Sequence, residues 1–150
     1  DVQKKWFLRQ LERAQELTMP IIIHSRDAAS DTMEMLKRMD GGRNGGVIHC
    51  YSYSREQARE YIKMGFHIGV GGVVTFKNSR RLQEVVEDIP LEKIVLETDS
   101  PYMAPVPFRG TRNSALNIPY IAEKIAEIKG VPVQKVYDQT YANALKMYKM

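Results

Sequence analysis

The spacing of hydrophobic residues alternates along this chain between a strand-like and a helical pattern, and this alternation restricts the fold more than any other feature. Short apolar runs that suit buried strands lie at residues 21–24, 47–50, 67–73 and 93–99. Helical spacing predicts helices over 4–17, 27–39, 54–62, 79–88 and 118–129, with one or two shorter helices closing the chain. Strands that alternate with helices in this way predict an α/β fold with a parallel sheet.

Local signals mark both ends of the helix predicted over 54–62. Ser54 and Gln57 have the spacing of a capping box, in which each side chain pairs with the backbone of the other residue. Gly65 stands where a glycine commonly follows the last turn of a helix. These signals support this helix independently of the hydrophobic pattern.

Two architectures are built from repeated strand–helix units of this kind. Four such units are half of an eight-stranded βα barrel, which typically needs about 250 residues. They also fit a small, open, doubly wound sheet. The phosphate-binding patterns GxGxxG and GxxxxGK[ST] are absent, so nothing in the sequence supports the second architecture.

Composition narrows the class of protein further. The 150 residues are 43% hydrophobic and 27% charged with a net charge of +4, which is typical of a soluble globular domain. One cysteine, Cys50, excludes a disulfide framework within the chain and fits a reducing compartment, so we expect a cytoplasmic protein. No apolar run approaches the ~20 residues of a membrane-spanning helix, and we expect no membrane association.

Three residues that carry chemistry end three of the predicted strands, namely His24, His49 and Asp99. Catalytic groups of βα barrels gather at the carboxyl ends of the strands. Two imidazoles and a carboxylate are suitable ligands for a divalent metal such as zinc or manganese. A single strand-end histidine is more often structural, but three such groups in equivalent places favour a metal site.

Strand periodicity adds further candidates near the same end of the sheet. Side chains alternate between faces, so Arg26, Tyr51 and Glu97 share a face with the three strand-end groups. Glu97 lies one layer deeper, where we expect a buried structural or supporting acid that needs a cationic or hydrogen-bonding partner. His67 begins its strand, so we expect it at the opposite end in a structural role.

The loop after the last predicted strand carries Arg109 and Arg112. Guanidinium groups match phosphate oxygens in a bidentate geometry. An ordinary solvated loop explains the two arginines equally well, and the residues alone leave both interpretations open.

Seven motifs follow one another along the chain: PIIIHSRDA (20–28), VIHCYS (47–52), IGVGG (68–72), LETDSPY (96–102), RGTRN (109–113), PYIAEK (119–124) and YANAL (141–145). Together they resemble the TatD family of metal-dependent deoxyribonucleases, over nearly the whole chain. The resemblance implies an amidohydrolase-like TIM barrel with one or two divalent metal ions (Mg, Mn or Zn). It also implies hydrolysis of DNA phosphodiester bonds by metal-activated water, including 3′ exonuclease action on single strands.

The resemblance also implies roles for individual residues. His24 and His49 are expected to be metal ligands. Asp99 is expected to be both a ligand and the catalytic base that orients or deprotonates the attacking water. The residues expected to contact the DNA substrate are Arg26, Tyr51, Arg109 and Arg112.

The sequence departs from the family pattern in two places. Ser114 and Ala115 stand where the family usually has Glu-Pro, and the family's His-x-His strand and later Glu-bearing strand have no counterpart here. We therefore expect residues 1–150 to form a single partial domain, the C-terminal half (strands five to eight) of a TatD-like barrel whose N-terminal half is absent. Because unpaired strand edges are adhesive, we expect the chain to pair with the missing half or with itself.

Two other functions remain open at the level of sequence. One is an amidohydrolase-like enzyme that cleaves a small ester, lactone or amide, which uses the same metal chemistry. The other is an inert fragment of such an enzyme that serves in assembly or folding, because an incomplete ligand set binds metal weakly.

Overall fold

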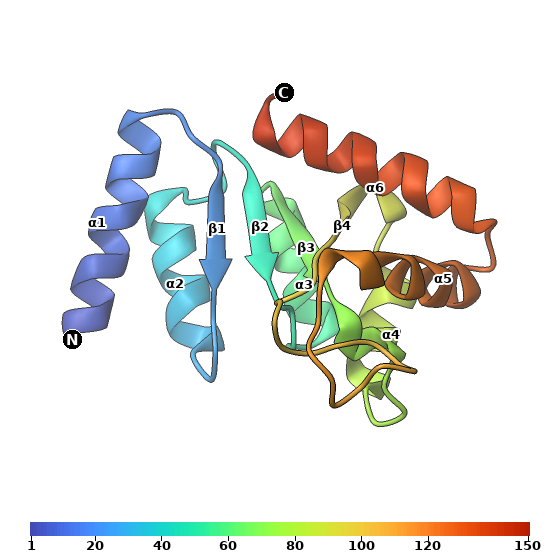
Figure 1. The fold of residues 1–150 in the computed structure, drawn as a ribbon. Coiled ribbons are helices and arrows are strands. Elements are labelled where there is room, and N and C mark those ends of the chain that lie inside the picture. The colour runs from blue at the N-terminus through green and yellow to red at the C-terminus, as the bar shows by residue number, and fades with distance from the viewer.

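The computed structural model describes residues 1–150 and confirms an α/β fold with one parallel sheet (Figure 1). The strands are β1 (Ile21–His24), β2 (Gly46–His49), β3 (Phe66–Val70) and β4 (Ile94–Leu96). The helices are α1 (Val2–Glu16), α2 (Ala29–Met39), α3 (Arg55–Lys63), α4 (Arg80–Asp88), α5 (Ile118–Lys129) and α6 (Val133–Tyr148). Three 3-10 turns are η1 (Gly72–Thr75), η2 (Leu91–Lys93) and η3 (Ala115–Asn117). None of the helices combines the length and the apolar character needed to cross a membrane.

The order of the strands distinguishes the two architectures that the sequence left open. The strands pair as β1-β2-β3-β4, and every pair is parallel. A doubly wound sheet reverses its strand order at a switch point, and this sheet has no reversal. Sequential parallel order is the arrangement of βα barrels, whose neighbours in sequence are neighbours in space. Figure 1 shows the strands side by side, with α6 across the end where β3 and β4 begin.

Side-chain alternation gives the sheet two different faces. On the helix-covered face, one isoleucine from each strand stands in register with the next: Ile23, Ile48, Ile68 and Ile94. All four are at most 3% exposed and belong to the main core cluster, which includes residues from every helix. Burying one such side chain contributes about 1.5–3 kcal/mol, so this row is a major part of the core.

The other face of the sheet has a much smaller apolar cluster. It consists of Val47, Val95 and Met147, the last contributed by α6. Ile22, on the edge strand β1, is 62% exposed. This face therefore leaves room for polar side chains at both ends of the strands.

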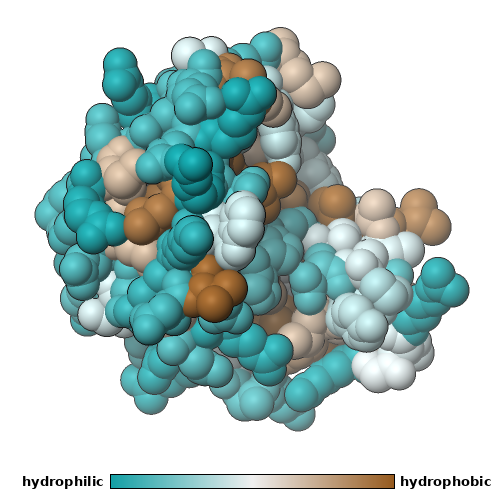
Figure 2. All heavy atoms as spheres, turned by 90° about the vertical axis from the view of Figure 1, so that its left-hand side faces the viewer, coloured by the Kyte–Doolittle hydropathy of each residue, from teal (hydrophilic) through white to brown (hydrophobic).

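The surface formed by α1 and the segment that follows it carries several exposed apolar side chains. Val2, Trp6, Leu17 and Met19 are each 47–72% exposed. Figure 2, viewed from this side, shows a mainly hydrophilic surface on which the hydrophobic groups are separated from one another. Such isolated apolar groups are normal on a protein surface.

The predicted boundaries of α3 are confirmed. The Ser54 side chain accepts the Gln57 N–H and the Gln57 side chain accepts the Ser54 N–H, which completes the capping box. Gly65 follows the helix with φ +102°, a conformation that side chains rarely adopt. The local signals were therefore sufficient to place this helix.

Two predictions at the C-terminal side are wrong. One helix closes the chain, as one of the predicted alternatives had it, but α6 has 16 residues and is longer than α5, not shorter. The buried Asn143 side chain anchors it by donating to the Leu91 and Ile94 carbonyls, at 2.8 and 2.7 Å. The last strand, predicted over 93–99, ends at Leu96, and the following residues reach Asp99 with φ +54°, which is incompatible with a strand.

Candidate metal and hydrolytic site

The three strand-end residues predicted from the sequence converge at the carboxyl end of the sheet. His24 and His49 are register partners in β1 and β2, and their ring centroids lie 5.7 Å apart. The segment after β4 brings Asp99 to the same place, with its Oδ1 3.1 Å from His49 Nε2. Parallel strands produce this convergence because their carboxyl ends all lie at one edge of the sheet.

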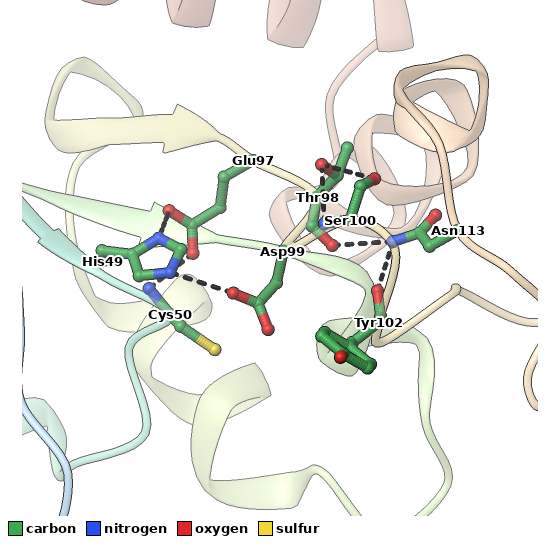
Figure 3. A network of polar contacts seen from close by, with 8 residues as sticks. All are labelled: His49, Cys50, Glu97, Thr98, Asp99, Ser100, Tyr102 and Asn113. Atoms are coloured by element: carbon green, nitrogen blue, oxygen red, sulfur yellow. Dashed lines mark hydrogen bonds and ion pairs between the residues drawn. The ribbon is translucent and has the colours of Figure 1, made fainter.

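Glu97 holds the opposite side of the His49 ring (Figure 3). Its Oε2 lies 2.7 Å from His49 Nδ1, and its Oε1 accepts the Cys50 backbone N–H at 2.5 Å. The His49 and Glu97 side chains are only 22% and 15% exposed. A carboxylate that fixes one ring nitrogen leaves the other oriented toward the site, which is the usual support of a metal-binding histidine. The expected supporting role of Glu97 therefore agrees with this geometry.

The close packing around Glu97 depends on Gly69 of β3. A Cβ atom at Gly69 would overlap the Glu97 carboxylate. Glycine at this point lets the carboxylate lie flat against the neighbouring strand and reach His49. Gly69, which weakens the apolar pattern of β3, thus makes room for the site.

Burial and the polar partners act in opposite directions on the pKa values of both His49 and Glu97. Burial raises the pKa of Glu97, although His49 and the Cys50 N–H partly oppose it. Burial alone would lower the pKa of His49, but the charges and hydrogen bonds of Glu97 and Asp99 outweigh it and raise that pKa. Two carboxylates facing one imidazole stabilise positive charge at this position.

The residues present fit a metal ion as a partial set of ligands. No group of three or more His, Cys, Asp or Glu side chains is arranged to hold a metal. His49 Nε2 and Asp99 Oδ1 lie 3.1 Å apart at the end of the sheet that also carries His24, and these residues would supply ligands to one ion. A full set therefore needs a movement of His24 or donors from outside this chain.

Two residues of the site adopt the left-handed backbone conformation, Cys50 with φ +48° and Asp99 with φ +54°. Such conformations cost on the order of 1–3 kcal/mol and persist where the surroundings enforce them. Asn113, which is 3% exposed, enforces the second one by donating to the Thr98 and Tyr102 carbonyls at 2.7 and 2.8 Å (Figure 3). Sequence reasoning missed this role, although Asn113 ends one of the motifs that it singled out.

A cavity of about 310 Å³ opens beside these groups. Its lining includes four of the predicted site residues, His24, Arg26, Tyr51 and Asp99, together with Cys50 and Glu97. Its size falls within the range of small-molecule sites, about 300–1,000 Å³. The cavity gives the predicted site room for a substrate group.

Three of the residues predicted to contact the substrate, Tyr51, Arg109 and Arg112, are either buried or lie outside the cavity lining. The ring of Tyr51 is 3% exposed and its hydroxyl donates to the Ser54 carbonyl at 2.6 Å, while burial raises its pKa far above the usual range. Arg109 stacks on the Phe76 ring with 4.2 Å between the guanidinium carbon and the ring centroid. Arg109 and Arg112 are exposed and line no part of the cavity, so their contact with substrate remains a prediction.

A sequential parallel sheet with imidazoles and carboxylates at its carboxyl end is the arrangement of βα-barrel metal-dependent hydrolases. A family profile described as "TatD related DNase" matches residues 1–149, and the chain belongs to this family. This confirms the family that the motifs predicted.

Individual relatives agree with this assignment. The uncharacterized metal-dependent hydrolase YabD of Bacillus subtilis is 42% identical over 150 residues, which are 100% of this chain and 59% of the relative. The uncharacterized metal-dependent hydrolase YcfH of Escherichia coli K12 is 37% identical over 146 residues, 97% of this chain and 55% of the relative. The crystal structure of YjjV, a TatD homologue from Escherichia coli K12, superposes with a TM-score of 0.87 at 30% identity, covering 94% of this chain and 54% of the other. The chain thus spans a little over half the length of these relatives.

Proposed function

We propose that this protein is a TatD-type metal-dependent hydrolase and that it hydrolyses DNA phosphodiester bonds. The observation that carries the proposal is the meeting of His24, His49 and Asp99 at the carboxyl end of the sheet beside a cavity. Membership of the family and the names of the relatives, which describe them as metal-dependent hydrolases, support it.

Each side chain of the site has a distinct task in this proposal. His24, His49 and Asp99 would hold one or two ions of Mg²⁺, Mn²⁺ or Zn²⁺. Such an ion polarises a phosphoryl oxygen and lowers the pKa of a water molecule. Glu97 fixes the orientation of His49 through Nδ1. The Asp99 carboxylate orients the attacking water and accepts its proton.

Phosphate recognition is assigned to cationic side chains around the cavity. Arg26 lines it, and its guanidinium can meet a phosphate group that enters. The exposed Arg109 and Arg112 would contact phosphates further along a strand of DNA, and the ring of Tyr51 forms part of the cavity wall. This cationic set favours DNA over a small uncharged ester, lactone or amide.

The coverage of the relatives supports a proposal about the fold as well. We propose that the four strand–helix units are the C-terminal half of a barrel. A complementary half, or a second copy of this chain, would then pair with the free edges of β1 and β4. The single cysteine supports the cytoplasm as the location.

A second candidate is that residues 1–150 alone are catalytically inert. The observation that favours it is the absence of a group of three ligands arranged to hold a metal. On this view the chain contributes half of a site, and hydrolysis requires the donors of a complementary half.

One experiment separates these proposals. The full-length protein, its Asp99→Asn variant and the isolated 150-residue chain are each incubated with Mn²⁺, Mg²⁺ or Zn²⁺ and single-stranded DNA, or a small ester, lactone or amide. DNA cleavage by the full-length protein that the variant loses supports the nuclease. Cleavage of only the small substrates contradicts it in favour of the amidohydrolase-like enzyme. Activity of the full-length protein without activity of the isolated chain supports the second candidate.

A further inference from the structure

The β4–η3 loop, residues 97–114, lies beyond the carboxyl ends of the strands (Figure 1). It exposes four large hydrophobic side chains within a short stretch: Tyr102 is 70% exposed, Met103 47%, Val106 44% and Phe108 37%. The exposed apolar groups near α1 are separated from one another, but these four are concentrated in one loop, of which Asp99 and Met103 line the hydrolytic cavity. Hydrophobic groups that gather in this way beside a cavity mark a binding surface.

Tyr102, the most exposed of the four, is held next to Asp99 by its backbone. Its N–H donates to the Asp99 carbonyl at 2.9 Å, which closes a β-turn, and its carbonyl accepts from the Asn113 side chain at 2.8 Å (Figure 3). No aromatic pair in the structure includes its ring. The ring is therefore presented to solvent from a fixed backbone position, at the end of a turn that begins at the proposed catalytic base.

The middle of the loop packs closely on η1. The Val106 N–H donates to Thr75 Oγ1 at 2.8 Å, and a Cβ atom at Gly72 would overlap the Met103 carbonyl. Met103 has φ +56°, a left-handed conformation that a non-glycine residue keeps where its surroundings enforce it. A loop fixed in this way has little conformational entropy to lose when a ligand binds, so its side chains form a preorganised surface.

The charge of the loop complements a polyanion. Its only acidic residues, Glu97 and Asp99, belong to the hydrolytic site. None of the ion pairs in the structure includes Arg109 or Arg112. The Arg109 guanidinium lies over the ring of the buried Phe76, and this contact fixes the position of the cation. The loop thus combines exposed aromatic groups with two cations that no carboxylate neutralises.

Single-stranded nucleic acid is the ligand that uses both kinds of group. Proteins that bind single strands contact the backbone with cations and stack bases on aromatic side chains. In a duplex each base is covered by the neighbouring base pairs, so only a single strand offers the face of a base to an exposed ring. The short turn between Asp99 and Tyr102 brings such a ring beside the hydrolytic cavity.

We propose that the β4–η3 loop binds single-stranded DNA, with a base stacked on the ring of Tyr102 beside the phosphate that enters the hydrolytic cavity. Arg109 and Arg112 contact phosphates further along the strand. The proposal rests on the proposed nuclease function and adds the part of the substrate that the site recognises, which is the face of a base. Because every base has such a face, this recognition does not depend on sequence.

The test is the binding of a 5′-labelled single strand of about 10 nucleotides to the metal-free, full-length protein, measured by fluorescence anisotropy. Tyr102→Ala should weaken binding about tenfold, which corresponds to about 1.4 kcal/mol. Both hydrogen bonds of residue 102 use backbone atoms, so this variant removes only the exposed ring. Tyr102→Phe keeps the ring and should retain binding. Tyr148→Ala, which truncates a 47% exposed tyrosine at the far end of α6, is the matched control and should leave binding unchanged.

An abasic analogue shows whether the ring of Tyr102 contacts a base. The nucleotides at the 3′ end are replaced in turn by the analogue, which keeps the phosphate and removes the base. At one position the replacement should weaken binding to the natural protein about tenfold and should cause no further loss in Tyr102→Ala. Circular dichroism verifies that every variant is folded.

Salt dependence separates the cations from the ring. Arg112→Ala should reduce the slope of log K against log salt concentration by ~0.7, the value for one phosphate contact on a single strand. Tyr102→Ala should leave the slope unchanged, because stacking releases no counterions.

Four results overturn the proposal: no binding of the single strand, equal affinity of the natural protein and Tyr102→Ala, additive losses at every abasic position, or tighter binding of duplex DNA or of single-stranded RNA. The nuclease proposal fails separately, because binding without metal requires no hydrolysis. Binding that depends on Tyr102, without cleavage after Mn²⁺ is added, rejects the nuclease and keeps the stacking surface. Cleavage by a protein whose affinity for DNA does not depend on Tyr102 does the reverse.

Discussion

His49 and His67 stand on neighbouring strands and on the same face of the sheet, but at opposite ends of it. Both ring nitrogens of His49 lie against carboxylates, and the pKa of the ring is raised. His67 has a buried nitrogen without a partner, lies near two lysines, and has a lowered pKa. A histidine at the carboxyl end of a strand therefore has acidic neighbours, and a histidine near the start of the next strand has basic neighbours.

The difference follows from the chain topology. Every strand of a parallel sheet ends at the same edge, so the loop after β4 delivers its carboxylates beside the end of β2. The opposite edge receives η2 and α6, which carry Lys93 and Lys146. The polarity of the strands thus separates an acidic, metal-compatible end from a basic end.

The largest effect is expected from breaking the acidic end at Asp99. Asp99→Asn keeps the size of the side chain but removes its charge and its capacity to accept a proton. Under the proposed nuclease function, the kcat/KM of the full-length protein for DNA should fall by about 10²–10⁴-fold. Asp138→Asn, at an exposed position of α6, is the matched control and should leave the rate unchanged. A rate within a factor of two or so of the natural enzyme would remove Asp99 from the mechanism.

The next effect compares the stability that the two faces of the sheet contribute. Ile48→Ala truncates a side chain of the isoleucine row that is 1% exposed, and it should lower the free energy of unfolding by about 2–5 kcal/mol. Ile22→Ala, on the other face, is 62% exposed in this chain and should change it by less than about 0.5 kcal/mol. Urea denaturation of the 150-residue chain measures both. Equal losses would mean that the two faces are covered to the same extent.

A smaller effect should follow from removing the partner of His49. Glu97→Gln replaces a carboxylate by a neutral amide, so the pKa of His49 should fall, because Glu97 is the leading cause that raises it. Affinity for Mn²⁺ or Zn²⁺ should weaken by about 10–100-fold, as for other partners of metal-binding histidines. An NMR titration of the ring and calorimetry with the metal report the two quantities. Glu127→Gln, at an exposed position of α5, should alter neither the pKa of His49 nor the affinity for the metal.

The smallest effect concerns the basic end and its dependence on pH. The pKa of folded His67 is below its unfolded value of about 6.5, so the unfolded chain takes up a proton first as the pH falls. Stability from this residue is present above pH ~6.5 and is lost as the pH falls through the lower, folded pKa. His67→Gln should therefore show a smaller decrease in Tm between about pH 7.5 and 5.5 than the natural chain. A larger decrease in the variant would mean that His67 is protonated in the folded state.

Much of the site could be predicted because its members are marked by their place along the chain. His24, His49 and Asp99 each follow an apolar run, and topology alone brings such residues together. The pairing of Glu97 with His49 was not predictable from spacing, because it depends on the register of strands and on a glycine in between. The hydrogen bonds that Asn113 donates to the Thr98 and Tyr102 carbonyls were missed for a similar reason. The path of an irregular loop brings these groups together, and sequence spacing does not show that path.

The sequence by itself determined the alternation of strands and helices, the capping box of α3 and the strand ends at which chemistry gathers. These features are encoded by neighbouring residues, through side-chain periodicity and local hydrogen bonds. Only the tertiary structure decided that the sheet has no reversal of strand order, that α6 is one helix anchored by Asn143, and that His67 lies beside two lysines. Each of these depends on contacts between residues far apart in the chain, whose free energies become available only when the whole domain packs.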